Sequence, residues 1–168
     1  MARYISLTLT TRGVSCTARL LDNVAPRTCA AVWEALPLDG QVYHGKYARN
    51  EIYALLPVFS AQDPGKENTT VTPIPGDVCW FHFDADDLGN PGYGYEASAG
   101  VRDRPELIDL ALFYGRNNLL INGDQGWVPG NVFATVVDGL DVMAEACQSI
   151  WMDGARGEFL AFARAGED

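Results

Sequence analysis

A histidine and a glutamate seven positions apart, His44 and Glu51, form the most suggestive chemical pair in the sequence. Residues 41–44 and 50–56 are each typical of a short strand, and side chains two apart in a strand share one face. If the two strands are neighbours, the imidazole and the carboxylate meet at one end of the fold as an acid–base pair. The alternative is a solvated strand end or a structural ion pair, because spacing along the chain fixes no geometry.

Other polar and aromatic side chains follow the same segments. Tyr53 shares a strand face with Glu51, while Tyr114 ends the apolar segment 110–114 and Arg116 lies just beyond it. An arginine at the rim of a fold can hold a carboxylate through two parallel hydrogen bonds. Most loop arginines have no specific partner, and three more lie in expected loops: Arg49, Arg102 and Arg104.

The sequence predicts no metal or cofactor. Residues 84–90 (DADDLGN) resemble a calcium loop, but Leu88 occupies the fifth ligand position of an EF-hand and Tyr95 the twelfth. His82 is expected to be an ordinary residue on a strand face. Glu67 is expected to cap a loop, and the alternative is that it lies at the same end of the fold as His44 and Glu51.

The four cysteines are far apart without a Cys-x-x-Cys pair, which predicts buried, reduced thiols. The sequence has no nucleotide-binding, hydrolase or zinc motif.

Charge and hydropathy narrow the class of protein. A net charge of −10 disfavours a nucleic-acid partner, which requires a clustered basic surface. No apolar run approaches the 18 or so residues of a membrane span. The N-terminal residues MARYISLTLT alternate in polarity and are not typical of a signal peptide, so a cytoplasmic location is expected. A length of 168 residues fits one domain over residues 1–168.

Alternation and turn residues predict a mainly β fold. Two helices are indicated, at 26–36 after Pro26 and at 140–151 with an apolar stripe at helical spacing. A long acidic, glycine-rich loop is expected at 84–106, of a length typical of a lid or binding loop. Short alternating strands predict a closed antiparallel β-barrel capped by the two helices. The expected strands are 4–10, 14–20, 41–44, 50–56, 78–83, 110–114, 131–137 and 158–164.

Three segments, in the same order, resemble the cyclophilins: LLDNVAPRTCAAVWEAL at 20–36, EIYALLPVFSAQ at 51–62 and GWVPGNVFATVVDGLDVMAEA at 126–146. The segments HGKYARNEIY and ENTTVTPIPGDV look closest to an uncharacterised bacterial branch of cyclophilin-like proteins. The resemblance implies a cyclophilin-like barrel with the first helix after an opening hairpin and the second after a late strand.

The same resemblance argues against prolyl isomerase activity. Ala54 stands where the cyclophilins have the arginine that hydrogen-bonds the prolyl nitrogen, and a methyl group cannot replace a guanidinium. Asp63 and Pro64 replace a glycine pair, and Asn131 replaces a histidine. Some positions are retained and imply a groove: Gln62 matches the substrate-binding glutamine, Trp127 the family tryptophan, and Phe113 with Tyr114 an aromatic pair beside the proline pocket.

Two functions follow as alternatives. The first is binding, with or without transformation, of a small polar or carboxylate-bearing molecule in a barrel-mouth pocket lined by His44, Glu51, Tyr53, Tyr114, Arg116 and Trp127. The second is a peptide- or protein-binding module, or a weak prolyl isomerase, with a cyclophilin-type groove that uses Gln62, Phe113 and Trp127. Self-association is also expected, because strand edges and the apolar pair Trp151-Met152 need covering.

Overall fold

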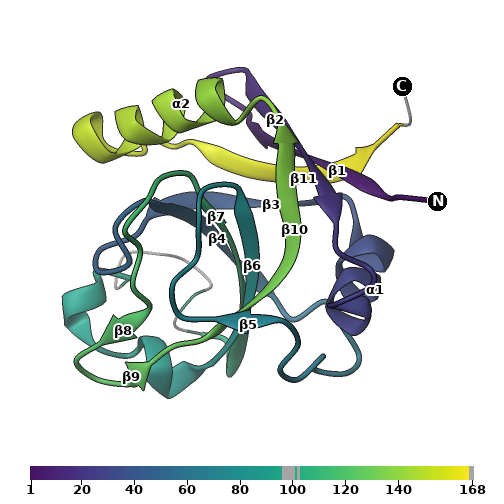
Figure 1. Cartoon of the computed structure of the whole chain (residues 1–168). Coiled ribbons are helices and arrows are strands. Elements are labelled where there is room, and N and C mark those ends of the chain that lie inside the picture. The colour runs from purple at the N-terminus through teal and green to yellow at the C-terminus, as the bar shows by residue number, and fades with distance from the viewer. Residues whose placement is uncertain (96–100, 102, 167–168) are drawn as a thin grey trace.

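A closed antiparallel β-barrel is the body of the protein in the computed structural model, which describes residues 1–95, 101 and 103–166. Within these residues eight strands follow one another around the barrel in the order β2-β1-β11-β3-β4-β7-β6-β10, and pairing of β2 with β10 closes the ring (Figure 1). The strands are β1 (Tyr4–Leu9), β2 (Val14–Leu20), β3 (Leu38–His44), β4 (Glu51–Pro57), β6 (Asp77–Asp84), β7 (Glu106–Phe113), β10 (Gly130–Asp138) and β11 (Phe159–Ala165). The predicted fold class, a mainly β closed barrel with two helices, is confirmed.

The two helices pack on different parts of the barrel. Helix α1 (Pro26–Ala35) contacts β10, whereas α2 (Leu140–Asp153) lies along the upper end in Figure 1 and contacts β2 and β3. Helix α2 follows Gly139, which has a φ of 80°, and a Cβ there would lie 3.0 Å from the Ser15 carbonyl oxygen. Only glycine fits both the left-handed backbone and this close approach. Trp151 and Met152, in the last turn of α2, are exposed, and self-association stays a prediction.

Helix α1 is capped from outside its own sequence. Its N-cap residue Ala25 has no capping side chain, and Glu67 takes that role. The Glu67 carboxylate accepts hydrogen bonds from the Arg27 amide at 3.1 Å and from the Thr28 amide and hydroxyl at 2.8 and 2.9 Å. Although burial opposes the charged form, these hydrogen bonds lower the pKa of Glu67. The carboxylate therefore satisfies amide donors that a helix start leaves open.

Side chains fill two separate apolar regions, one on each face of the sheet. Within β4, Ile52, Ala54 and Leu56 point into the barrel, where they join the main core. Tyr53 points outward and belongs to a second cluster, whose other members include Cys79, Phe81, Phe83, Ala111 and Phe113 from β6 and β7. Because strand side chains alternate, the outer face of these three strands also carries a row of apolar side chains.

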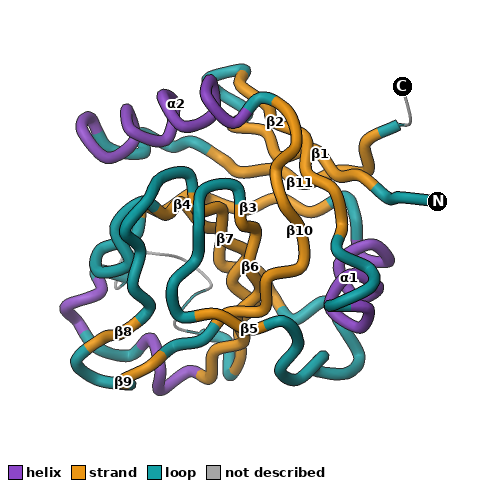
Figure 2. The backbone as a smooth tube through the Cα atoms, viewed as in Figure 1, coloured by secondary structure: helices purple, strands orange, loops and turns teal. Residues whose placement is uncertain are grey.

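Long connections cover this outer face. They contain the short 3₁₀ helices η1 (Ala85–Leu88) and η2 (Pro91–Tyr93) and the hairpin of β8 (Ile121–Asn122) and β9 (Gly126–Trp127). Figure 2 shows these pieces grouped on one side of the barrel, opposite α1. A further two-residue strand, β5 (Thr69–Thr70), pairs with β10. The connections contribute the buried side chains of Tyr95, Leu120 and Val128 to the second cluster.

Element boundaries depart from the sequence prediction mainly at β7. This strand begins at Glu106 rather than at residue 110, because Glu106 and Asp109 look like loop residues in the sequence, whereas Asp109 is buried within the strand. Strand β3 also begins three residues early, at Leu38. Among the described residues, no helix is both long enough and apolar enough to cross a membrane.

Candidate functional site

An enclosed pocket lies between the outer face of β4, β6 and β7 and the connections that cover it. The pocket encloses about 30 Å³, which is room for roughly one or two water molecules. Two residues of its floor are acids, Glu51 on β4 and Asp109 on β7, and the rest is largely aromatic and amide. The other lining residues are Gly45, Lys46, Tyr47, Tyr53, Phe81, Phe83, Asp87, Leu88, Tyr93, Tyr95, Leu120, Asn122 and Gln125.

Both acids are buried, and one of them lacks a partner. Glu51 is 7% exposed and Asp109 is 5% exposed. Asp109 lies in the middle of β7, opposite Leu55 of β4 and Phe81 of β6. Its Oδ1 atom is buried without a hydrogen-bond partner among the described residues. A buried acceptor without a donor costs free energy, so this oxygen is the natural contact for a group that enters the pocket.

Burial makes both acids hold their protons. It raises the pKa of Glu51 to about 8. Burial, and then the negative charge of Glu51, raise the pKa of Asp109 well above the ordinary aspartate value. Two carboxylates in one desolvated site cannot both ionise without a compensating cation. With these raised pKa values the pocket holds at least one neutral carboxyl group near neutral pH, and that group can lose its proton when a ligand binds.

Tyrosines line the pocket beside the two acids. The hydroxyl groups of Tyr53 and Tyr95 hydrogen-bond to one another. Tyr43 stacks on Tyr53 with ring centroids 5.6 Å apart and meets Tyr95 edge to face at 5.2 Å. The Lys46 Nζ atom lies 5.0 Å from the centre of the Tyr95 ring, within the range of a cation–π contact. Aromatic rings therefore surround the two acids, together with polar side chains.

Gly45 makes room for the Glu51 carboxyl group. A Cβ at position 45 would lie 2.7 Å from Glu51 Oε1 and 3.0 Å from Glu51 Cβ. The backbone of Gly45 also donates a 2.7 Å hydrogen bond to the Glu51 carbonyl oxygen. The turn between β3 and β4 therefore places a residue without a side chain directly beside the acid.

His44 and Glu51 do not form the expected acid–base pair. His44 is paired with Ile52, so it shares the inward face of the sheet, whereas Glu51 lies on the outward face. The His44 Nδ1 atom is 2.9 Å from the Gly45 carbonyl oxygen, which can only accept a hydrogen bond. The Nε2 atom is 2.6 Å from the Tyr114 hydroxyl and accepts a hydrogen bond from it. Burial lowers the pKa of His44, in keeping with this neutral form.

His44 and Tyr114 instead lie together at the barrel mouth beneath α2. The His44 ring packs 4.9 Å from the Trp151 ring. These three side chains line an open hollow of about 550 Å³. The hollow adjoins the enclosed pocket, because residues 45–47 line both. The structure thus divides the predicted mouth pocket into two neighbouring sites on opposite faces of the sheet.

The remaining predicted site residues are dispersed. Phe113 is fully buried in the second apolar cluster, and Arg116 is exposed near the start of the loop after β7. Trp127, on the β8–β9 hairpin, is 60% exposed. Gln62 lines a different hollow, near Trp80 and His82. These residues line no common pocket among those formed by the described part of the chain.

Ala54 and Asn131 have structural positions. Ala54 is fully buried and points into the barrel, so its position faces no groove. Asn131 accepts a hydrogen bond from the Glu67 amide at 3.2 Å and donates to Thr28 Oγ1 and the Gly65 carbonyl oxygen. Asn131 thus holds the segment that caps α1.

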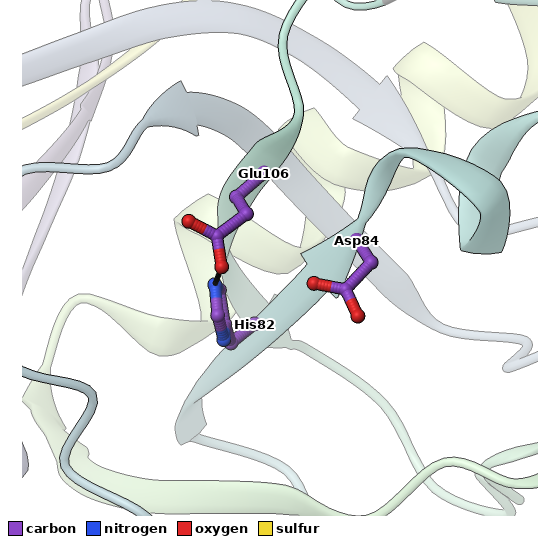
Figure 3. Close-up of side chains that lie close together, drawn as sticks. All are labelled: His82, Asp84 and Glu106. Carbon is purple, nitrogen blue, oxygen red and sulfur yellow. Dashed lines mark ion pairs between the residues drawn. The ribbon is translucent and has the colours of Figure 1, made fainter.

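A second polar cluster lies at the other end of β6 and β7. Figure 3 shows His82 facing Glu106, with Asp84 beside them. The His82 Nε2 atom is 3.3 Å from Glu106 Oε1, and its Nδ1 atom is 2.7 Å from Asp63 Oδ2. One ligand atom from each of His82, Asp84 and Glu106 lies within 4.8 Å of the others. Since both acids drawn are exposed and the imidazole already has ion-pair partners, the cluster does not by itself identify a ligand.

Asp109 and the residues that cover it were missed in the sequence. The available signal was a single acid within the otherwise apolar run 107–113 (LIDLALF). Such an acid is either an exposed residue of a half-buried strand or a buried functional group, and the periodicity of one strand does not separate these cases. Lys46, Tyr47 and Tyr95 lie in predicted loops, and only the fold brings them to the pocket.

Comparison with known proteins gives a family and a fold. A family model described as a protein of unknown function, DUF3830, matches residues 7–162. No curated protein matches the sequence significantly. The solved structure of McbB in complex with tryptophan is similar, with a TM-score of 0.62 and 16% identity. The alignment covers 98% of this chain and 45% of McbB, so this chain spans less than half of that protein's length.

A second similar structure is closer to this chain in size. The solution structure of the hypothetical protein AF2241 from Archaeoglobus fulgidus has a TM-score of 0.52 and 19% identity, over 98% of this chain and 95% of that one. At these identities the two structures support the fold alone. Neither is described as a cyclophilin, so the resemblance to that family stays a prediction.

Proposed function

Because the chain belongs to the DUF3830 family of proteins of unknown function, we propose its function from the site: it binds a small polar molecule in the pocket over Glu51 and Asp109. One observation carries the proposal. The Asp109 Oδ1 atom is buried at this pocket without a partner among the described residues. A buried oxygen without a hydrogen bond lowers the stability of the folded protein. Such atoms occur mainly where a ligand or an ordered water completes the hydrogen bond.

The setting of the pocket supports the same function. Two acids with raised pKa values, several aromatic walls and a few amide groups converge on one enclosed space. Enclosed, mostly apolar pockets with a small number of polar groups and perturbed acids are typical ligand sites. The proposal moves the predicted ligand from the barrel mouth to the outer face of the sheet, with Glu51 and Tyr53 retained from the predicted lining.

The adjoining hollow extends the proposed site. The enclosed cavity is small, so it receives a head group and not a large molecule. The hollow beside His44 and Trp151 shares residues 45–47 with the pocket and has a volume within the usual range of ligand sites. McbB is described in complex with tryptophan, which is a precedent for a small molecule bound by a protein of related fold. The identity of the ligand does not follow from that precedent, because the chains share only 16% identity.

The test is a thermal-shift screen of small metabolites against the wild type, Glu51→Gln and Asp109→Asn. A ligand of this pocket raises the melting temperature of the wild type and loses most of that effect in both variants. Glu145→Gln and Asp141→Asn, which change exposed acids of α2, serve as matched controls and leave the shift unchanged. Stabilisation that is equal in wild type and both pocket variants, or stabilisation only by proline-containing peptides, would show that the proposal is wrong.

A further inference from the structure

We infer that the pocket over Glu51 and Asp109 selects a protonated amine, so that the ligand is a small organic cation whose ammonium group enters beside the two acids. The inference rests on the proposed function and adds the chemical class of the ligand. Three features of the pocket support it: the charges of its lining, its aromatic walls and the unpartnered oxygen of Asp109.

Charge in the pocket favours a cation over an anion. Among the described lining residues the acids are Glu51, Asp87 and Asp109, and the basic residue is Lys46. A carboxylate-bearing ligand would bring a further negative charge into a desolvated space that already contains two buried acids. The carboxylate would add negative charge where three acids of the described lining already face one basic residue, and it would repel each acid that is ionised. An ammonium group has the opposite effect, because it adds positive charge to a pocket in which three acids face one basic residue among the described lining residues.

The aromatic walls favour the same class. Tyrosine and phenylalanine rings attract cations to their faces, and the effect is strongest where water is excluded. The protein already uses the contact once, with the Lys46 ammonium group 5.0 Å from the centre of the Tyr95 ring. Tyr53, Phe81 and Phe83 present further rings to the same space. Part of the ligand's lost hydration is therefore replaced by ring faces.

The hydrogen-bonding capacity of the pocket also favours an ammonium group. An ammonium group carries three donors and no acceptor. The Asp109 Oδ1 atom is a buried acceptor without a donor among the described residues. A hydrogen bond from the ligand to this oxygen would be charge-assisted once Asp109 ionises, which makes it stronger than a bond between neutral groups. A ligand carbonyl would instead need the Asp109 hydroxyl as donor and would bring no positive charge to the two buried acids.

Proton balance gives the inference a direct signature. Burial of the two acids keeps a carboxyl group of the pocket protonated near neutral pH. When the ammonium group binds, one carboxyl group loses its proton, and that proton goes to the solvent. The ammonium–carboxylate pair is neutral overall, as the protonated acid was. Binding of an amine at pH 7 therefore releases close to one proton, whereas binding of a neutral molecule releases none.

The experiment uses matched head groups on the full-length protein. Ethylammonium, propionamide and propionate, together with phenethylammonium and 3-phenylpropionate, are titrated calorimetrically at pH 7 in two buffers of different ionisation enthalpy. We expect the ammonium compounds to bind at least tenfold more tightly than their neutral and anionic partners, with close to one proton released. Asp109→Asn and Glu51→Gln should each weaken ammonium binding at least tenfold, while Glu145→Gln does not.

The outcomes separate this inference from the proposed function. If propionamide, propionate or 3-phenylpropionate binds as well as its ammonium partner and still depends on Asp109, the pocket binds small molecules but does not select amines. If ammonium compounds bind without proton release, or bind equally to Asp109→Asn, the inference is overturned as well. If neither this panel nor the metabolite screen produces binding that depends on Glu51 or Asp109, both proposals fail.

Discussion

Replacing Glu51 by glutamine should stabilise the protein, and the gain should grow with pH. Glutamine keeps the shape of the side chain but cannot ionise, so the variant never has to bury a charge. In the wild type the folded state keeps the Glu51 proton to about pH 8, against an ordinary glutamate pKa of 4.5. Between these values the unfolded chain has lost the proton and the folded chain has not, so wild-type stability falls as pH rises.

The size of the effect follows from the two pKa values. A difference between 4.5 and about 8 corresponds to about 5 kcal/mol of stability lost above pH 8, at roughly 1.4 kcal/mol for each pKa unit. Most of that loss falls between pH 5 and pH 9, where the stability advantage of Glu51→Gln should increase by about 4 kcal/mol. The variant also removes the negative charge that helps to raise the pKa of Asp109.

Urea denaturation of both proteins at pH 5 and at pH 9, in about 0.15 M salt, measures this difference. Over that range the neighbouring hydroxyl and thiol groups stay neutral, because burial raises the pKa of each: Tyr47, Tyr53, Tyr95 and Cys79. The other titratable groups at the pocket are Lys46, Asp87, Tyr93 and Asp109. Glu145→Gln, at an exposed site on α2, controls for the loss of one negative charge. A stability difference that does not change with pH, or a variant less stable at pH 9, would refute the argument that Glu51 is buried as a neutral acid.

Three further predictions follow from the contacts. Glu67→Ala should lower the free energy of unfolding by about 2–3 kcal/mol, measured by urea denaturation, because it removes the carboxylate that caps α1; a loss below about 0.5 kcal/mol would contradict the capping role. The protein should not accelerate prolyl isomerisation in a protease-coupled assay, since Ala54 is buried in the barrel core; a rate near that of an active cyclophilin would contradict this. Gly45→Ala should weaken ligand binding at least tenfold, because its Cβ would displace the Glu51 carboxyl group. Gly123→Ala, where a Cβ meets nothing within 4 Å, is the matched control.

The elements of the fold were predictable because their causes are local. Alternation in residues 14–20 and the helical stripe in 140–151 each reflect one face of an element turned towards apolar surroundings. Pro26 marks the start of α1 in the sequence as it does in the structure. The closed barrel followed from the number of short strands and the two helices. The capping of α1 did not follow, because Glu67 lies 39 positions from Thr28 in the sequence.

The site depends on the register between strands and on the connections that cover the sheet, and neither can be read from the sequence. A shift of one residue between β3 and β4 would put His44 and Glu51 on the same face; the actual pairing of His44 with Ile52 puts them on opposite faces. The sequence showed an acid within the apolar run of β7. Only the tertiary structure determined that the connections fold over the outer face of the sheet and bury it. Whether a strand residue is buried depends on the segments that lie over it. The acids on this face would be exposed to solvent without those segments, and they line a pocket because distant parts of the chain cover them.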